Sequence, residues 1–133
     1  MRRQLSDSGV TVYRNGDRIN LYLPSNITFD TSSAAVKTEF YHILQDVALV
    51  LNEYNKTTLV IAGHTDDTGT AELNQQLSLA RANNVRAQLV NYGVDYRRIT
   101  TQGYGEFSPL YPNNSDENRR ANRRVELTVI PNT

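Results

Sequence analysis

The chain has no cysteine, few glycine and proline residues, and no long apolar run. The lack of cysteine excludes disulfides and thiolate chemistry, although it does not identify the cellular compartment. No single sign of charge dominates, because 14 basic and 14 acidic side chains give a formal net charge of zero. No overall field therefore attracts nucleic acid or an anionic membrane. The apolar runs also fall short of the roughly 20 residues that a membrane-spanning helix needs.

A length of 133 residues is sufficient for one domain with its own hydrophobic core. The N-terminus, Met1-Arg2-Arg3, is not followed by the apolar segment of a signal peptide. We therefore expect a soluble fragment of a longer protein. Residues 1–9 are expected to be a leading linker, and residues 10–131 to form the domain.

Several segments have the patterns of strands. Residues 10–13 and 19–23 alternate with period two on either side of a turn, which predicts a β-hairpin. Residues 27–30 are expected to be a short extended piece. The later strands are expected at residues 59–62, 99–104 and 123–130. The first of these three is almost wholly apolar, as is typical of a central strand that helices cover.

Two segments have the 3/4 apolar spacing of long helices. The first spans the apolar positions from Val36 to Tyr54 and is expected to be capped by Thr31, Ser32 or Ser33. The second runs from about residue 71 to residue 92, and Gly93 is its expected stop. The alternation of strands and helices indicates an α/β domain.

Two polar side chains interrupt the apolar face of the second helix. At 100° per residue, Asn74 and Arg81 are nearly superimposed and fall in the middle of that face. A charged group there must be paired, or must line a cavity that is open to a ligand. Asp66, at the carboxyl end of the preceding strand, is the expected neighbour. The apolar face itself consists of Leu73, Leu77, Val85 and Leu89.

The turn before this helix carries a recognisable motif, Gly63-His64-Thr65-Asp66-Asp67-Thr68-Gly69. The motif continues with Asn74, Leu77-Ser78, Arg81-Ala82, Gln102-Gly103 and Asn122-Arg123-Arg124-Val125-Glu126. This pattern resembles the OmpA-like C-terminal domain over roughly residues 20 to 130. That domain is a peptidoglycan-binding module of outer-membrane proteins, Pal-type lipoproteins and flagellar stator subunits. The resemblance implies an α/β (α+β) two-layer sandwich, with a mixed sheet of about four strands, two long helices on one face, and the N-terminal hairpin in addition.

The resemblance also implies non-catalytic binding of the peptidoglycan stem peptide through meso-diaminopimelate. Asp66 and Arg81 would hold the far end of that residue, and Asn74 and Arg123 would assist. Thr65 and Leu73 complete the predicted ligand-binding set. No cofactor and no metal are expected. The lipoprotein branch of the family fits best, although the cysteine pair of some members is missing and residues 106–118 do not match closely.

The same resemblance implies a periplasmic domain whose parent protein is anchored in the outer membrane. Membrane association would occur only through a missing N-terminal region, and other envelope proteins are candidate partners. The expected function is to tether the parent protein to the cell wall. The alternative is a docking module in a stator- or secretion-associated complex.

The chemistry of the residues agrees with this ligand. The far end of diaminopimelate carries an ammonium and a carboxylate on one carbon, so its recognition needs an anion and a planar cation. Asp66 can accept hydrogen bonds from the ammonium, and Arg81 can donate two parallel bonds to the carboxylate. Backbone N–H groups at the start of the second helix also favour an anion. Arg123 shares strand parity with Val125, so we expect it to face the apolar side, with Arg124 and Glu126 on the other.

Each of these features has another interpretation. Asp66 and Arg81 can form a purely structural ion pair. His64 can suggest a metal or base site, but the chain has only one other histidine, so a hydrogen-bonded residue at the strand end is favoured. Asp67 is expected to be solvated. The arginine-rich run 119–124 can suggest nucleic acid, but neutral net charge favours solvated arginines around one buried Arg123.

One point stays open. Tyr104, Phe107 and Tyr111 either form a pocket wall or pack the loop in which they lie. An enzyme is not expected, because it would need a nucleophile or base with an orienting partner, and no such pattern or carboxylate pair is present.

Overall fold

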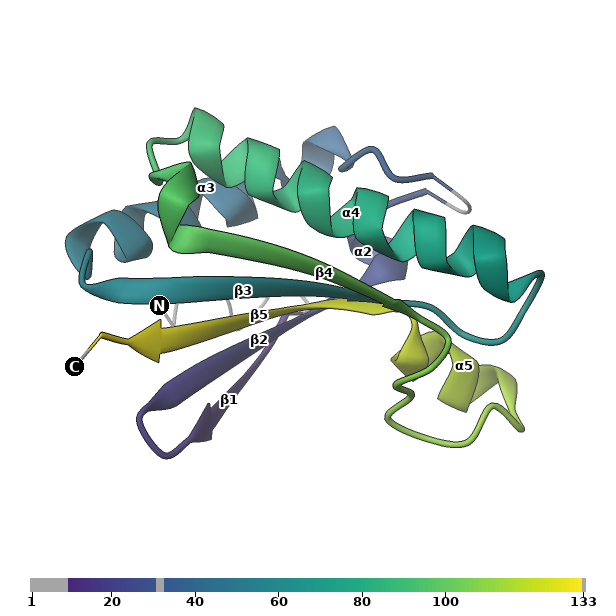
Figure 1. Ribbon diagram of the computed structural model, residues 1–133. Helices are drawn as coiled ribbons and strands as arrows, with labels where there is room; N and C mark the ends of the chain where they lie inside the picture. Colours follow the sequence, from purple (N-terminus) through teal and green to yellow (C-terminus); the bar gives the residue numbers. More distant parts are fainter. Residues whose placement is uncertain (1–9, 31–32, 133) are drawn as a thin grey trace.

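The computed structural model describes residues 10–30 and 33–132. Five strands and two long helices form two layers (Figure 1). The strands are β1 (Thr11–Asn15), β2 (Arg18–Pro24), β3 (Thr57–His64), β4 (Ile99–Gly105) and β5 (Arg124–Pro131). The helices are α2 (Ser25–Thr28), α3 (Tyr41–Glu53), α4 (Ala71–Asn91) and α5 (Asp116–Asn122), with single 3-10 turns at η1 (Thr38–Phe40) and η2 (Tyr96–Arg98).

The five strands form one mixed sheet in the order β1-β2-β5-β3-β4. Only β3 and β4 run parallel, joined by the crossover helix α4, and the other pairs are antiparallel. The predicted hairpin is confirmed, and it extends the same sheet through the pairing of β2 with β5. Helices α3 and α4 cover one face, while the other face is free of helices along most of its length (Figure 1).

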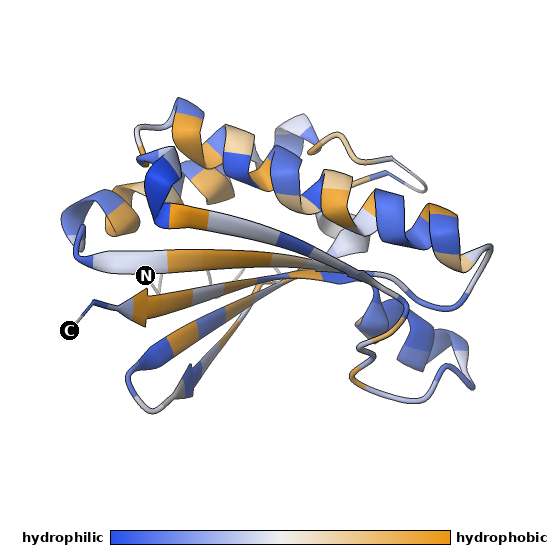
Figure 2. Cartoon of the chain, viewed as in Figure 1, coloured by the Kyte–Doolittle hydropathy of each residue, from blue (hydrophilic) through white to orange (hydrophobic). Residues whose placement is uncertain are grey.

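The core lies between this sheet and the two long helices. Alternate residues of the central strands, such as Leu59, Ile61 and Leu127, are almost fully buried beneath α3 and α4. Much of β3, which lies in the middle of this layer, has the colour of apolar residues (Figure 2). No helix in the described part of the chain has the length and apolarity to cross a lipid bilayer.

Two glycines allow α4 to lie directly on the sheet. A Cβ atom on Gly63 would lie 2.0 Å from the backbone oxygen of Ser78. A Cβ on Gly103 would lie 2.7 Å from the backbone nitrogen of Leu79. The middle of α4 is therefore held against the carboxyl ends of β3 and β4, where the motif residues begin.

Some predicted boundaries were wrong. The first long helix begins at Tyr41 and not near residue 34, because Val36 instead forms an isolated bridge with Phe29. The hydroxyl of Ser33 accepts a bond from the N–H of Ala35 and does not cap that helix. Residues 25–28 form a helical turn where an extended piece was predicted at 27–30. The suggested caps Thr31 and Ser32, and the leading residues 1–9, lie outside the described residues.

Candidate functional site

A cavity of about 400 Å³ opens between α2, α4 and the turn that follows β3. Its volume lies in the range of small-molecule binding sites. Five of the six predicted site residues line it, and Leu73 does not. The lining residues are Ser25, Phe29, Asp30, Thr65, Asp66, Thr68, Asn74, Leu77, Arg81 and Arg123.

Asp66 is the buried anion of the cavity, and its side chain is 6% exposed. One carboxylate oxygen accepts the N–H of Thr68 at 2.9 Å, and the other accepts a close hydrogen bond from Arg123. Burial alone would raise the pKa of this carboxyl, but the bonds from Thr68 and Arg123 lower it below its usual value. Asp66 is therefore ionised at neutral pH, and its oxygens retain lone pairs for a further donor.

Arg81 is the buried cation of the cavity, but it does not pair with Asp66 as the sequence suggested. Its guanidinium donates to the backbone oxygens of Ser33, at 2.9 Å, and Asp30, at 3.3 Å. It also lies over the ring of Phe29, 4.7 Å from the centroid. Burial, and then the nearby charge of Arg123, lower its pKa to about 10, so it stays charged at neutral pH. Within the described residues, no carboxylate neutralises Arg81.

Asn74 and Thr65 hold the turn that carries Asp66. The amide of Asn74 donates to the backbone oxygens of Asp66, at 3.2 Å, and Thr68, at 3.0 Å. The buried hydroxyl of Thr65 donates to the same Asp66 oxygen at 2.9 Å. The two side chains fix the direction in which the Asp66 carboxylate enters the cavity.

Leu73 is not where the helical periodicity placed it. Its side chain is exposed, because the first turn of α4 extends past the end of the sheet. Its N–H donates to the hydroxyl of Thr70, which caps the helix. Leu73 does not line the cavity, so the structure gives no support to its predicted role in ligand binding.

Arg123 reaches the cavity by a different route from the predicted one. It is the residue after α5, one position before β5, and its side chain is 38% exposed. The predicted buried position on this run belongs instead to Arg124, whose side chain is 5% exposed and pairs with Glu126. Within this run, Arg123 therefore lines the cavity and Arg124 forms a buried ion pair. The sequence had instead predicted solvated arginines around one buried Arg123.

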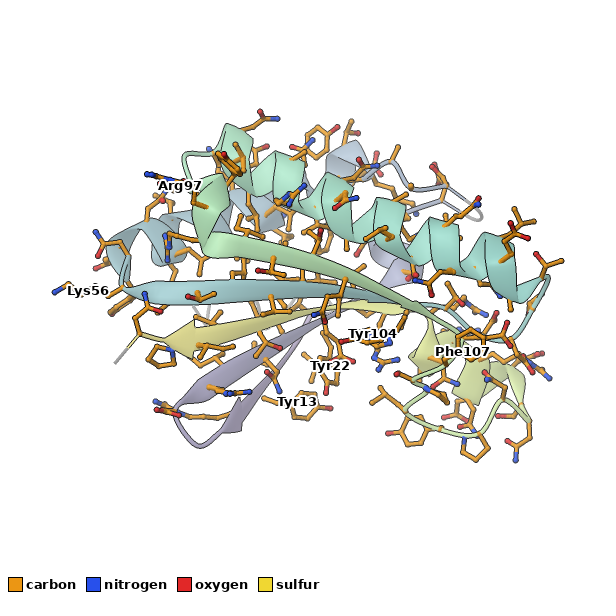
Figure 3. All side chains as sticks on the ribbon, viewed as in Figure 1. Tyr13, Tyr22, Lys56, Arg97, Tyr104 and Phe107 are labelled. Carbon is orange, nitrogen blue, oxygen red and sulfur yellow. The ribbon has the colours of Figure 1, made fainter. Side chains whose placement is uncertain are left out.

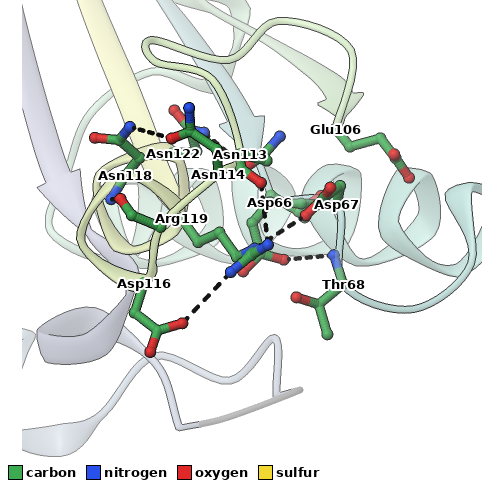
Figure 4. Close-up of polar contacts among 12 residues, drawn as sticks. Asp66, Asp67, Thr68, Glu106, Asn113, Asn114, Asp116, Asn118, Arg119 and Asn122 are labelled. Atoms are coloured by element: carbon green, nitrogen blue, oxygen red, sulfur yellow. Dashed lines mark hydrogen bonds and ion pairs between the residues drawn. The ribbon is translucent and has the colours of Figure 1, made fainter.

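Helix α5, which the sequence analysis missed, and the residue that follows it position two arginines against two consecutive carboxylates. Arg119 and Arg123, four residues apart, contact Asp67 and Asp66 respectively. Arg119 also reaches Asp116 at 3.4 Å and the backbone oxygen of Asn113 at 3.0 Å (Figure 4). Asp67 is partly exposed but paired, so the prediction of a merely solvated carboxylate was incomplete. The Ser115 cap and the acidic first turn are the sequence signals that mark this helix.

Ser25 is a further cavity residue that sequence reasoning missed. It is 3% exposed, and its hydroxyl has no hydrogen-bond partner within residues 10–30 and 33–132. A buried hydroxyl without a partner is costly, and here it lies at the wall of an open cavity.

His64 lies beside the site, on the other face of the sheet. It is buried, with Nε2 3.4 Å from a Glu126 oxygen and its ring stacked on that of Tyr104. Burial, and then the charge of Arg124, lower its pKa to about 4, so it is neutral at pH 7. No group of three or more candidate metal ligands occurs in the part of the chain that the structure describes.

Together, the fold and the cavity define an α/β domain that places a buried anion and a buried cation in one cavity beside the carboxyl ends of β3 and β4. The chain belongs to the OmpA family, whose model matches residues 28–123.

Similar proteins extend this assignment. The chain is 45% identical over 131 residues to the probable lipoprotein YiaD of Escherichia coli, covering 98% of this chain and 60% of that protein. The chain thus spans less than two thirds of this relative. It superposes on the cell wall anchor of the T6SS from Pseudomonas aeruginosa with a TM-score of 0.88 and 33% identity, covering 98% of this chain and 96% of that one. The peptidoglycan-associated lipoprotein of Burkholderia pseudomallei gives a TM-score of 0.71 and 29% identity, covering 77% and 87%.

Proposed function

We propose that this domain binds peptidoglycan non-covalently, through the meso-diaminopimelate of the stem peptide, and thereby tethers its parent protein to the cell wall. The observation that carries this proposal is a buried cation, Arg81, without an anionic partner among the described residues, in the same cavity as the buried anion Asp66. A ligand with a carboxylate and an ammonium on one carbon complements both groups.

The geometry suggests how the two charges would be shared. Arg81 is as buried as Asp66 and is held by neutral groups, so it would take the ligand carboxylate in two parallel bonds. Asp66 would accept hydrogen bonds from the ammonium while keeping its bond from Arg123. The amide oxygen of Asn74 and the hydroxyl of Ser25 would accept or donate the remaining bonds.

The names of the similar proteins support the same biological role. One is a cell wall anchor and another is a peptidoglycan-associated lipoprotein. We infer a periplasmic location, with the parent protein attached to the outer membrane by a region beyond this chain. The relative named as a lipoprotein supports that attachment.

Sedimentation with purified cell-wall sacculi tests this proposal. We expect the chain to bind sacculi with diaminopimelate stems, and Asp66→Ala and Arg81→Ala each to weaken binding by about 2–5 kcal/mol, because each leaves a ligand charge unpaired in a partly desolvated pocket. Arg120→Ala is the matched control, since it removes an exposed arginine.

Sacculi with lysine stems test whether binding is specific for diaminopimelate. Lysine lacks the second carboxylate, so Arg81 would stay without an anion and binding should be poor even for the unaltered chain. Equal binding of both stem types would contradict the diaminopimelate mechanism. A soluble muropeptide that is shortened during incubation would instead indicate an enzyme.

A further inference from the structure

Tyrosine side chains lie on the sheet face that α3 and α4 leave open. On β2, Leu21 and Leu23 are buried in the core, so Tyr22 between them faces the other way. The same alternation places Tyr13 of β1 and Tyr104 of β4 on the open face (Figure 3). Tyr13 is 50% exposed and Tyr104 is 38% exposed.

These rings are joined by side chains of the two central strands. The rings of Tyr13 and Tyr22 are 4.8 Å apart, and the guanidinium of Arg124 lies 5.9 Å from the Tyr22 ring. Arg124 pairs with Glu126, which approaches His64. The ring of His64 is stacked on Tyr104 at 5.2 Å. The result is a strip with a contribution from every strand of the sheet, which we call the cross-strand strip: Tyr13, Tyr22, Arg124, Glu126, His64 and Tyr104.

The strip carries little net charge, and its accessible parts are the rings and hydroxyl groups of its tyrosines, because Arg124 and His64 are buried. Arg124 and Glu126 neutralise one another, and His64 is neutral. Tyrosine combines an apolar ring with a polar tip, and exposed aromatic groups on one face mark interaction sites. A neutral ligand with apolar C–H faces and many hydroxyl groups, which is the chemistry of a sugar ring, fits this surface.

One end of the strip is also close to the cavity along the chain. His64 is two residues before Asp66, and two extended residues span at most about 7 Å. Beyond Tyr104, the N–H of Phe107 donates to the backbone oxygen of Tyr104, and the Phe107 side chain is 69% exposed. In peptidoglycan the stem peptide is covalently joined to an amino-sugar chain. A stem held at Asp66 would bring its own sugars close to Tyr104 and Phe107.

We propose that the cross-strand strip, with Phe107 at its end, is a second binding surface for the amino-sugar chain of the same polymer. This inference rests on the proposed function and assigns the glycan part of the ligand to the open sheet face. The cavity binds the charged end of the stem peptide, and the tyrosine rings of the strip stack against neutral sugar rings.

The two parts can be tested with separate probes. A β-1,4-linked N-acetylglucosamine oligomer carries no peptide, and free meso-diaminopimelate carries no sugar. In NMR titrations of the chain, we expect the oligomer to shift resonances of Tyr13, Tyr22, Tyr104 and Phe107. Diaminopimelate should instead shift those of residues around Asp66 and Arg81.

Substitutions then assign the contacts. Tyr104→Ala and Phe107→Ala should each weaken oligomer binding by about fivefold or more and leave diaminopimelate binding unchanged. Tyr104→Phe keeps the ring and should bind nearly as well as the unaltered chain. Tyr96→Ala is the matched control, because Tyr96 is 63% exposed at the other end of β4.

The outcomes separate this inference from the proposed function. If diaminopimelate binds but the oligomer shifts no resonance of the strip, the second surface is wrong and the cavity stands. If Phe107→Ala, whose exposed side chain contributes little to the core, binds the oligomer as tightly as Tyr96→Ala, the strip is equally excluded. If the oligomer binds the strip and diaminopimelate does not bind, the assignment of the cavity fails instead.

Discussion

Arg81 shows how a single side chain separates a ligand site from a structural ion pair. A buried pair neutralises itself, and removing either partner leaves an uncompensated charge. Arg81 instead donates to the carbonyl oxygens of Ser33 and Asp30 and lies on Phe29. These neutral groups hold the guanidinium without cancelling its charge. The charge therefore remains available to an anion in the cavity.

His64 gives the domain a measurable pH dependence. Its folded pKa of about 4 lies below the unfolded value of 6.5. Between these values the unfolded chain binds a proton that the folded chain does not, so the free energy of unfolding falls as the pH is lowered from 6.5 to 4. Each pKa unit corresponds to about 1.4 kcal/mol, which gives a loss of about 3 kcal/mol. The groups facing His64 are Glu126, already paired, Arg124 and Tyr104.

Urea unfolding at pH 7 and pH 4.5 measures this effect. His64→Gln should lose much of the decrease, since it carries no proton-binding ring. His42→Gln, with an exposed side chain on α3, should keep it. The low pKa of Asp66 contributes in a separate window, because its stabilisation is lost only as the pH falls below the usual carboxyl range. Equal pH dependence in both variants would show that His64 is not the responsible group.

At the scale of elements, the close contact of α4 with β3 sets the position of the cavity. Gly63→Ala would place a methyl group 2.0 Å from the Ser78 oxygen, so α4, with Asn74 and Arg81, must move away. We expect a loss of about 3 kcal/mol or more in unfolding free energy, at the upper end of the cost of overpacking. Diaminopimelate binding should weaken as well.

Gly16→Ala is the comparison for this substitution. Gly16 has a φ of 64° in the hairpin turn, and a Cβ there would meet nothing within 4 Å. Its cost should be limited to left-handed strain of about 1–2 kcal/mol, with binding unaffected. Urea unfolding and calorimetric titration measure both quantities. A Gly63→Ala loss no larger than that of Gly16→Ala would mean that the helix does not depend on this contact.

The elements also show which structural features the sequence could predict. Helix α4, its stop at Gly93 and the buried positions of Asn74 and Arg81 followed from periodicity, because a 21-residue helix repeats its pattern many times. The start of α3 could not be predicted in this way. Val36 continues the apolar spacing of the helix, but it forms a β-bridge with Phe29 and lies outside the helix. Short segments carry too few repeats to distinguish a helical turn from a strand, as at residues 25–28.

The lining of the cavity was largely predictable, but its pairing was not. Helix spacing and the family resemblance predicted Asp66, Arg81, Asn74 and Arg123, and all four line the cavity. Which arginine contacts Asp66 depends on where α5 ends relative to the turn after β3, and no local pattern encodes that placement. The unpartnered hydroxyl of Ser25 likewise appears only when α2 folds beside the cavity.

At the scale of the whole molecule, the question is whether the buried charges serve folding or a ligand. If they served folding alone, Arg81→Ala would lose stability and retain sacculus binding. Because Arg81 is only 4% exposed, its removal should in either case cost about 1–3 kcal/mol, through carbonyl groups left unpaired. The loss of stability alone therefore does not decide the matter, and the response to ligand does.

A ligand that binds only the folded state stabilises it by mass action. Free meso-diaminopimelate at about 100 times its dissociation constant should add about 2.7 kcal/mol. For a chain of this size that raises the melting temperature by roughly 10 °C. Arg81→Ala and Asp66→Ala should melt at the same temperature with and without ligand, whereas Arg86→Ala, which removes a half-buried arginine of the same helix, should respond like the unaltered chain. If the Arg81 variant gained as much as Arg86→Ala, the guanidinium would be a structural group, and the carboxylate of the ligand would have to be bound elsewhere.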